Sequence, residues 1–282
     1  MKSRSFGVLR LVGAFLIVGA ALAADPPSLA DFHDTTKGHY QVLTQGGRQI
    51  GANVNWYMNE ILKQYSQFFS NWSPKQSARV VVFTKWADFQ GYARAETHSS
   101  GLAGYCLVKQ DDQGRPFHEL VTCEHDYLYR TLAHEGFHQF VAYELAGRAP
   151  TWLNEGLAQY FETATVLHNR LQTGQISRSK LLAAQSLLDK KQAPTIAELI
   201  QMDRATFYRQ AGHSYPTSWA LVYFLLHREN DKYSESDMRH YFTDLKLGKD
   251  SVSSFSSRFG RNSRELQEEF ERYVFRLKAR FD

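Results

Sequence analysis

The sequence predicts an α+β protein in which a small mixed sheet with helices is followed by a mostly helical part. Three observations support this. Short apolar runs of strand type are confined to the first 125 residues of the 282-residue chain. From residue 126 onward, apolar residues recur at helical spacing. An apolar content of 43% allows a sizeable core, and it excludes a wholly disordered or collagen-like chain.

The N-terminus has the pattern of a secretory signal peptide. Lys2, Arg4 and Arg10 are basic, the run from Leu11 to Leu22 is apolar, and Ala21-Leu22-Ala23 is a small-residue cleavage site. The run is shorter than the roughly 20 residues that a membrane-spanning helix needs, so we expect cleavage rather than a membrane anchor. The sequence therefore predicts an exported protein, periplasmic or secreted, with no membrane span after the signal at 1–23 is removed.

The net charge of +4 comes mostly from this leader. Three of the 33 basic residues and none of the 29 acids lie within residues 1–23, so the rest of the chain carries +1. A nearly neutral chain gives no electrostatic reason to bind a polyanion. We therefore expect no nucleic-acid partner, and the sequence leaves the oligomeric state open.

Strands and helices alternate within residues 24–125, the predicted N-terminal α/β lobe. Residues 31–38 predict a leading loop. Amphipathic spacing predicts a helix over 50–69 and a shorter one around 86–92. The predicted strands are 40–44, 78–83, 101–108 and 118–122.

The chain has two cysteines, Cys106 and Cys123, on either side of a turn-rich stretch. A hairpin closing near Gly114-Arg115 would set them opposite each other. An oxidising compartment would then favour a disulfide, which would contribute about 3 kcal/mol by closing that loop. The alternative is two buried free thiols.

Residues 126–282 predict a helical lobe that forms one unit with the preceding lobe, because no Pro- or Ser-rich linker separates them. Gly147 and Pro150 end the first helix. The predicted helices cover 127–145, 153–168, 179–190, 195–201, 215–227, 237–244 and 263–281.

The first of these helices contains the motif His134-Glu135-Gly136-Phe137-His138, an H-E-x-x-H pattern. Residues four apart lie on one face of a helix, so His134 and His138 can reach one metal ion. Neutral imidazole nitrogen suits Zn²⁺. Glu135 projects beside the metal, where it can accept a proton from a metal-bound water as general base. The bare pattern arises by chance in roughly a few per cent of such chains, so its neighbours decide its weight.

Glu155 supplies the third predicted ligand. The loop between the first two helices of the lobe is only Gly147–Pro150, so the helices must pack antiparallel or cross steeply. This brings the first turn of the second helix, with Glu155, back toward the two histidines. A catalytic zinc has three protein ligands and one open position. The alternative for Glu155 is an acid favoured by the helix dipole.

The combination of H-E-x-x-H with the segment Trp152-Leu153-Asn154-Glu155-Gly156-Leu157-Ala158 resembles the gluzincin class of zinc metallopeptidases. It is most similar to the peptidase MA-like family and its uncharacterised bacterial relatives. The resemblance implies a thermolysin-like catalytic domain in which His134, His138 and Glu155 bind Zn²⁺ and Glu135 is the general base. A metzincin is excluded, because it would need Gly and His where this chain has Val141 and Glu144.

Other residues are weaker candidates. Hydrolysis of a peptide needs a donor for the developing oxyanion, and members of this class often place it just before the helix that contains Trp219. Tyr215 is the predicted donor, His213 is the second choice, and a surface role for Tyr215 is equally compatible with the sequence. Gln159 and Asn154 are candidates to orient the zinc-bound histidines. Residues 101–108 could offer a sheet edge to a substrate backbone.

The sequence thus predicts an exported zinc metallopeptidase that acts on a peptide or protein substrate. Two alternatives stay open. One is a non-catalytic, peptidase-like binding or scaffolding module, although the presence of Glu135 argues against it. The other is a zinc amidase that acts on cell-wall peptides.

Overall fold

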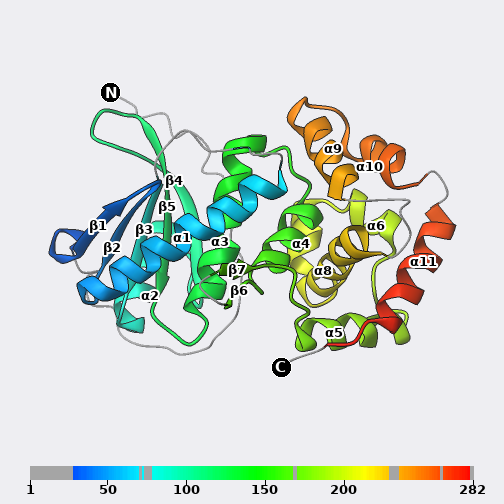
Figure 1. The fold of residues 1–282 in the computed structure, drawn as a ribbon, viewed down its shortest axis with the longest axis horizontal. Helices are drawn as coiled ribbons and strands as arrows, with labels where there is room; N and C mark the ends of the chain where they lie inside the picture. Colours follow the sequence, from blue (N-terminus) through cyan, green and yellow to red (C-terminus); the bar gives the residue numbers. More distant parts are fainter. Residues whose placement is uncertain are drawn as a thin grey trace. The chain divides into compact units, whose positions relative to one another are not determined.

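The computed structural model describes residues 28–69, 72, 78–167, 170–228, 235–260 and 263–279. It is a mixed α+β structure, as predicted (Figure 1). The predicted signal peptide, residues 1–23, lies outside the described residues. Among the described helices, none combines the length and the apolar character needed to cross a membrane.

The chain divides into two compact units. Of the described residues, those up to Lys63 and those from Ala78 to Phe140 form the first unit. Gln64–Phe69, Trp72 and the residues from Val141 onward form the second. Helix α1 (Arg48–Phe68) and helix α3 (Leu128–Leu145) each contribute to both units. The lobes predicted at 24–125 and 126–282 stay a prediction.

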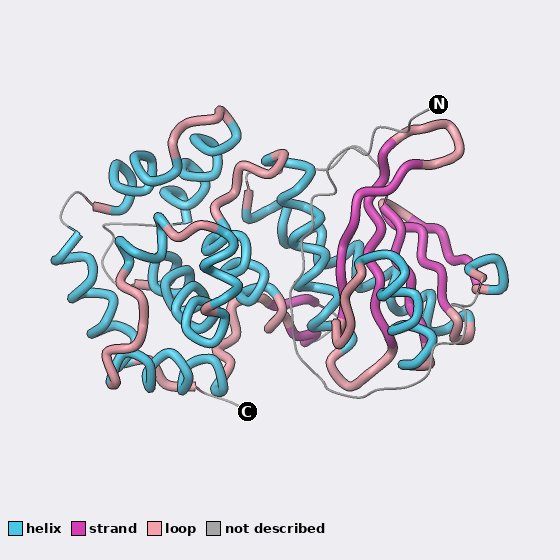
Figure 2. The backbone as a smooth tube through the Cα atoms, turned by 180° about the vertical axis from the view of Figure 1, so that it is seen from behind, coloured by secondary structure: helices cyan, strands magenta, loops and turns pink. Residues whose placement is uncertain are grey.

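A five-stranded mixed sheet forms the centre of the first unit (Figures 1 and 2). Its three inner strands are parallel to one another, and each edge strand is antiparallel to its neighbour. The inner strands are rich in apolar residues because helices cover both faces. In spatial order the strands are β1 (His33–Lys37), β2 (Tyr40–Thr44), β3 (Ala78–Phe83), β5 (Pro116–Cys123) and β4 (Gly104–Gln110).

Successive side chains of a strand point to opposite faces, and each face has its own helices. Helix α2 (Trp86–Thr97) packs its Phe89 into a cluster with Phe83 and Val121 on one face. On the other face, Asn55 of α1 donates to the carbonyl of Tyr40 at 2.8 Å. The strands and helices predicted between residues 40 and 122 are therefore confirmed, with shifted ends.

The predicted leading loop at 31–38 is wrong. It forms a short 3-10 helix, Leu29–Asp31, and the edge strand β1. Strand β1 is polar and mostly exposed, so it lacks the alternation that marks a half-buried strand. Its pairing with β2 and the turn at Gly38, which has a positive φ, create the strand through contacts that local sequence does not encode.

The predicted disulfide is also wrong, because Cys106 and Cys123 are free and buried. Cys106 lies opposite Leu120 in the β4–β5 pair, three positions from Cys123. An odd offset puts the two thiols on opposite faces of the sheet, where no disulfide can form. The register differs from the predicted one because the turn closes earlier: the backbone N–H of Gly114 donates to the carbonyl of Asp111.

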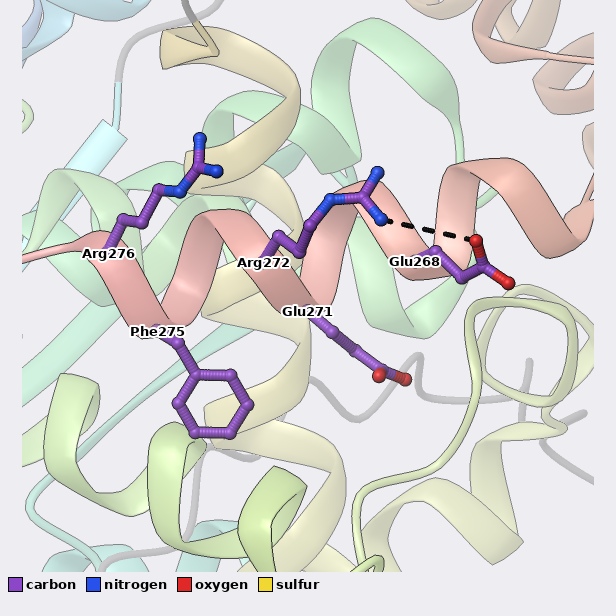
Figure 3. Close-up of a pocket in the computed structure, with 5 residues that line it drawn as sticks. All are labelled: Glu268, Glu271, Arg272, Phe275 and Arg276. Atoms are coloured by element: carbon purple, nitrogen blue, oxygen red, sulfur yellow. Dashed lines mark ion pairs between the residues drawn. The ribbon is translucent and has the colours of Figure 1, made fainter.

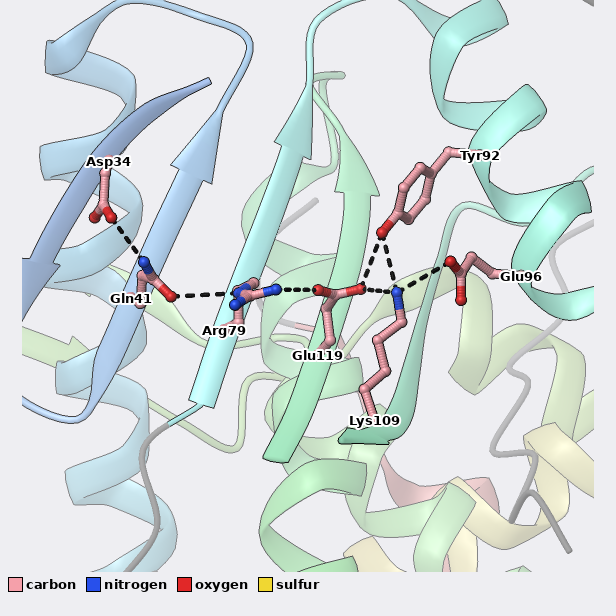
Figure 4. A network of polar contacts seen from close by, with 7 residues as sticks. All are labelled: Asp34, Gln41, Arg79, Tyr92, Glu96, Lys109 and Glu119. Carbon is pink, nitrogen blue, oxygen red and sulfur yellow. Dashed lines mark hydrogen bonds and ion pairs between the residues drawn. The ribbon is translucent and has the colours of Figure 1, made fainter. Parts of the chain in front are cut away.

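A row of polar side chains crosses the sheet (Figure 4). Its centre is the Glu119 carboxylate, only 1% exposed, which pairs with Arg79 at 3.2 Å and Lys109 at 2.7 Å. Burial lowers the pKa of Lys109, but the charge and hydrogen bond of Glu119 raise it by more, so the net pKa is above its usual value. Two cations thus compensate the buried acid. The drawn members are Asp34, Gln41, Arg79, Tyr92, Glu96, Lys109 and Glu119.

The buried histidine His118 predicts sensitivity to acid. Burial, and then the charge of His39, lower its pKa to about 4 from 6.5. Between these pH values the unfolded chain binds more protons. The stability that the neutral imidazole contributes is therefore complete above about pH 6.5 and is lost as the pH falls toward 4, by up to about 1.4 kcal/mol per unit.

We expect His118→Gln to reduce this loss. The measurement is the free energy of unfolding by urea at pH 8 and pH 5 for the wild type and the variant. The gap between the two pH values should be smaller in the variant. An equal gap in both proteins would assign the acid sensitivity to other groups.

The second unit is a helical assembly around α8 (Ala211–His227), which contacts most of the other helices of the unit. Helix α4 (Thr151–Phe161) lies beside it, and its residues from Trp152 to Phe161 are all buried (Figure 1). Most of these residues are apolar, and three are polar: Asn154, Glu155 and Gln159. The remaining helices are α5 (Arg178–Asp189), α6 (Ile196–Gln201), α7 (Arg204–Arg209), α9 (Glu235–Lys246), α10 (Ser251–Phe259) and α11 (Ser263–Arg276).

The structure differs from the predictions for this unit in four respects. Helix α4 ends at Phe161, not at residue 168, and is followed by the strands β6 (Thr165–Leu167) and β7 (Arg170–Gln172). Helices α7 and α10 were not predicted. Helix α8 begins at Ala211, four residues before the predicted start, and includes Pro216. Helix α11 ends at Arg276, not at residue 281.

Candidate metal centre

Helix α3 presents the two histidines of the motif. His134 and His138 lie one turn apart, with ring centroids separated by 4.7 Å and ring planes nearly perpendicular. Their exposed fractions are 6% and 0%. Residues 132–141 of the helix are buried throughout, so both imidazoles are desolvated.

Helix α4 presents Glu155, which is completely buried. The helix starts at Thr151, directly after Pro150, whose fixed φ of −63° suits the residue before a helix. The neighbouring Gly156 allows close packing: a Cβ there would lie 2.7 Å from the carbonyl oxygen of Ser218 on α8. The glycine therefore sets how closely α4, with Glu155, approaches α8.

The structure brings together the three predicted ligands. One potential ligand atom from each of His134, His138 and Glu155 lies within 4.8 Å of the others, and all three residues are buried. Zn²⁺ binds imidazole nitrogen and carboxylate oxygen atoms at about 2.0–2.2 Å. Two imidazoles and one carboxylate, all buried, are a donor set that fits a metal ion.

Comparison with known proteins matches residues 129–240 to one family model, which is described as a protein of unknown function (DUF1570). The match covers less than half of the chain, and it includes all three clustered residues. No curated protein matches the sequence.

Glu135 lies beside the edge strand β4. A Cβ at Gly104 would come within 3.3 Å of the Glu135 side chain and 2.6 Å of Thr131, so this glycine lets α3 pack closely against β4. Burial raises the pKa of the Cys106 thiol well above its usual value, and the Glu135 carboxylate adds to the rise. The Glu135 carboxylate therefore influences β4, the strand that contains Cys106, through its charge. Glu135 is 2% exposed.

The predicted oxyanion donor, Tyr215, lies in the second turn of α8. It is half-buried, and its ring packs against Phe207 and Tyr208 at centroid distances of 5.4 and 6.3 Å. His213, the second choice, is exposed in the first turn of the same helix. The catalytic role of either residue stays a prediction.

Tyr208 is a site residue that the sequence analysis missed. Its hydroxyl donates to Glu155 Oε1 at 2.7 Å. Burial, and then the Glu155 charge, raise its pKa far above 10, so the phenol stays protonated. Tyr208 lies on α7, the helix that was not predicted. The signal was Asp203, whose carboxylate accepts from the backbone of Thr206 and thus caps that helix.

Gln159 and Asn154, the candidates for orienting the histidines, lie on α4 and are buried. Gln159 donates to the carbonyl oxygens of Glu155 and Tyr215, and it accepts from Lys180 Nζ at 2.8 Å. These bonds connect α4 to α5 and α8. Gln159 therefore supports the backbone around Glu155.

A shallow hollow of about 440 Å³ also lies on α11 (Figure 3). It is lined by residues of this one helix, and Arg272 and Glu268 within it form an ion pair at 4.0 Å. It has no histidine or cysteine and is open to solvent. We do not assign it a function. The lining residues are Glu268, Glu271, Arg272, Phe275 and Arg276.

Proposed function

We propose that the protein is an exported zinc-dependent metallopeptidase. The observation that supports this is the buried cluster of His134, His138 and Glu155, with Glu135 next to the first ligand on the same helix. Two imidazoles and one carboxylate are the donor set of a catalytic zinc that keeps one open position. The resemblance to gluzincin peptidases points the same way. The leader at residues 1–23 supports export.

In this proposal the residues have distinct tasks. His134, His138 and Glu155 would hold Zn²⁺, which supplies a Lewis acid for the peptide carbonyl and the attacking water. Glu135 accepts the proton of that water and later delivers it to the leaving amine. Because Glu135 is buried, bulk water molecules do not compete for hydrogen bonds to its carboxylate. Tyr215 is the proposed donor to the oxyanion.

In this proposal the substrate backbone would bind along β4. Among the described strands, β4 lies at the edge of the sheet and pairs only with β5. An extended peptide can add to such an edge through main-chain hydrogen bonds. Gly104 brings that strand next to Glu135. We propose that β4 aligns a peptide or protein substrate for cleavage.

The first test combines metal content with hydrolysis. We expect the purified mature protein to contain one zinc per chain and to cleave an unstructured protein such as casein. Removal of the metal by a chelator should abolish cleavage, and added Zn²⁺ should restore it. Zinc binding without cleavage of casein or cell-wall peptides would favour the non-catalytic module. Cleavage of cell-wall peptides alone would favour the amidase, and a protein without zinc would refute the proposal.

A further inference from the structure

Tyr208 donates a hydrogen bond to the side chain of Glu155. The distance of 2.7 Å from its hydroxyl to Glu155 Oε1 is typical of a charge-assisted bond to a carboxylate. Glu155 is fully buried, so this donor works in a medium of low dielectric. The contact joins α7 to α4 across 53 residues of sequence. It therefore depends on tertiary structure.

The surroundings hold the Tyr208 side chain in place. The Asp203 cap fixes the start of α7. At its other end, Ser214 Oγ donates to the carbonyls of Phe207 and Gln210 at 2.7 and 3.0 Å. The Tyr208 ring packs against Phe207 and Tyr215. The hydroxyl is thus preorganised toward the carboxylate.

We propose that Tyr208 is a positioning residue whose hydrogen bond to Oε1 of Glu155 orients the carboxylate so that Oε2 alone binds the metal. This inference rests on the metal centre of the proposed function. A carboxylate bound through both oxygens would take up coordination space that a catalytic zinc keeps open for water and substrate. Outer hydrogen bonds of this kind fix the orientation of metal ligands. Tyr208 does not itself touch the substrate in this proposal.

The test is the zinc affinity of the full mature protein, measured by competition with a chromophoric chelator. Tyr208→Phe keeps the ring and removes the hydroxyl, and we expect zinc to bind about 10–100-fold more weakly. Tyr223→Phe is the matched control, because its hydroxyl donates to the Gly174 carbonyl at 3.3 Å and not to a ligand. The control should bind zinc as the wild type does.

A mutant cycle separates positioning from a general structural effect. In a Glu155→Ala background, Tyr208→Phe should have no further effect on zinc affinity, because no carboxylate remains to be held. An equal loss in both backgrounds would overturn the proposal. So would an unchanged affinity of Tyr208→Phe, even if the wild type binds zinc and cleaves peptides. A wild type without zinc would instead refute the metal centre as well.

A measurement on the wild type alone covers the case in which Tyr208→Phe does not fold. A crystal structure of the zinc-bound wild type shows how many oxygens of Glu155 lie at bonding distance from the metal. We expect one oxygen from Glu155. Two oxygens from Glu155 would overturn the proposal whatever the variants do.

Discussion

Glu135→Gln is expected to lower the rate of peptide hydrolysis by about 10²–10⁴-fold, the usual contribution of a general base, while the bound zinc stays at the wild-type level. The amide has nearly the shape of the carboxylate, so the buried site is preserved, but it cannot accept the proton of water. Because Glu135 is not one of the three clustered ligands, the metal should not be lost. The measurement is kcat on a quenched peptide together with zinc per chain.

The matched control is Glu144→Gln on the same helix. Glu144 pairs with Lys246 at 2.6 Å, and loss of such an ion pair costs at most about 1 kcal/mol. We expect its kcat to be unchanged. If Glu135→Gln retained full activity with zinc bound, the carboxylate would not be the base and the proposed mechanism would fail. A parallel loss of zinc would show that Glu135 supports the metal instead.

Gly156→Ala is expected to be strongly destabilising for so small a change. The new methyl group would lie 2.7 Å from the carbonyl oxygen and 3.0 Å from the carbonyl carbon of Ser218, both backbone atoms, and 2.8 Å from Val222 Cγ2. Backbone cannot rotate away, so α4 and α8 must move apart. Overpacking of this kind costs about 1–3 kcal/mol, and sometimes more. We expect the melting temperature to fall by about 2–4 °C per kcal/mol.

Gly212→Ala is the control for this substitution. Gly212 lies in the first turns of α8, and no atom is within 4 Å of a Cβ built there. Alanine also favours a helix over glycine by up to about 1 kcal/mol. We expect this variant to be as stable as the wild type or more stable. If Gly156→Ala also unfolded at the wild-type temperature, the close contact of α4 with α8 would not be a constraint on the fold.

Since Glu155 is adjacent, we expect Gly156→Ala to bind zinc more weakly as well.

Local sequence predicted the helices and strands whose structure is determined by residues close together along the chain. Helices α1, α3 and α5 have apolar residues at helical spacing, and β3 is a short apolar run between breaks. Strand β1 was missed because its polar, exposed residues become a strand only through pairing with β2. The short helix α7 was missed because its single capping acid is a weak signal beside the longer helices.

The two cysteines also show that local sequence does not determine how strands pair. The spacing of Cys106 and Cys123 is symmetric about Gly114-Arg115, and it favoured a disulfide. The actual register places Leu120 opposite Cys106, because the turn and the packing of both sheet faces decide the alignment. A shift by an odd number of residues reverses the face of every side chain, so the prediction failed completely.

The sequence by itself determined the composition of the candidate metal centre. Four residues along a helix return to the same face, and a four-residue loop forces the next helix back, so His134, His138 and Glu155 could be grouped without coordinates. The tertiary structure alone decided that Tyr208 holds the Glu155 carboxylate and that Gly156 meets the backbone of α8. Both contacts join residues more than 50 positions apart, and helical periodicity carries no information over that separation.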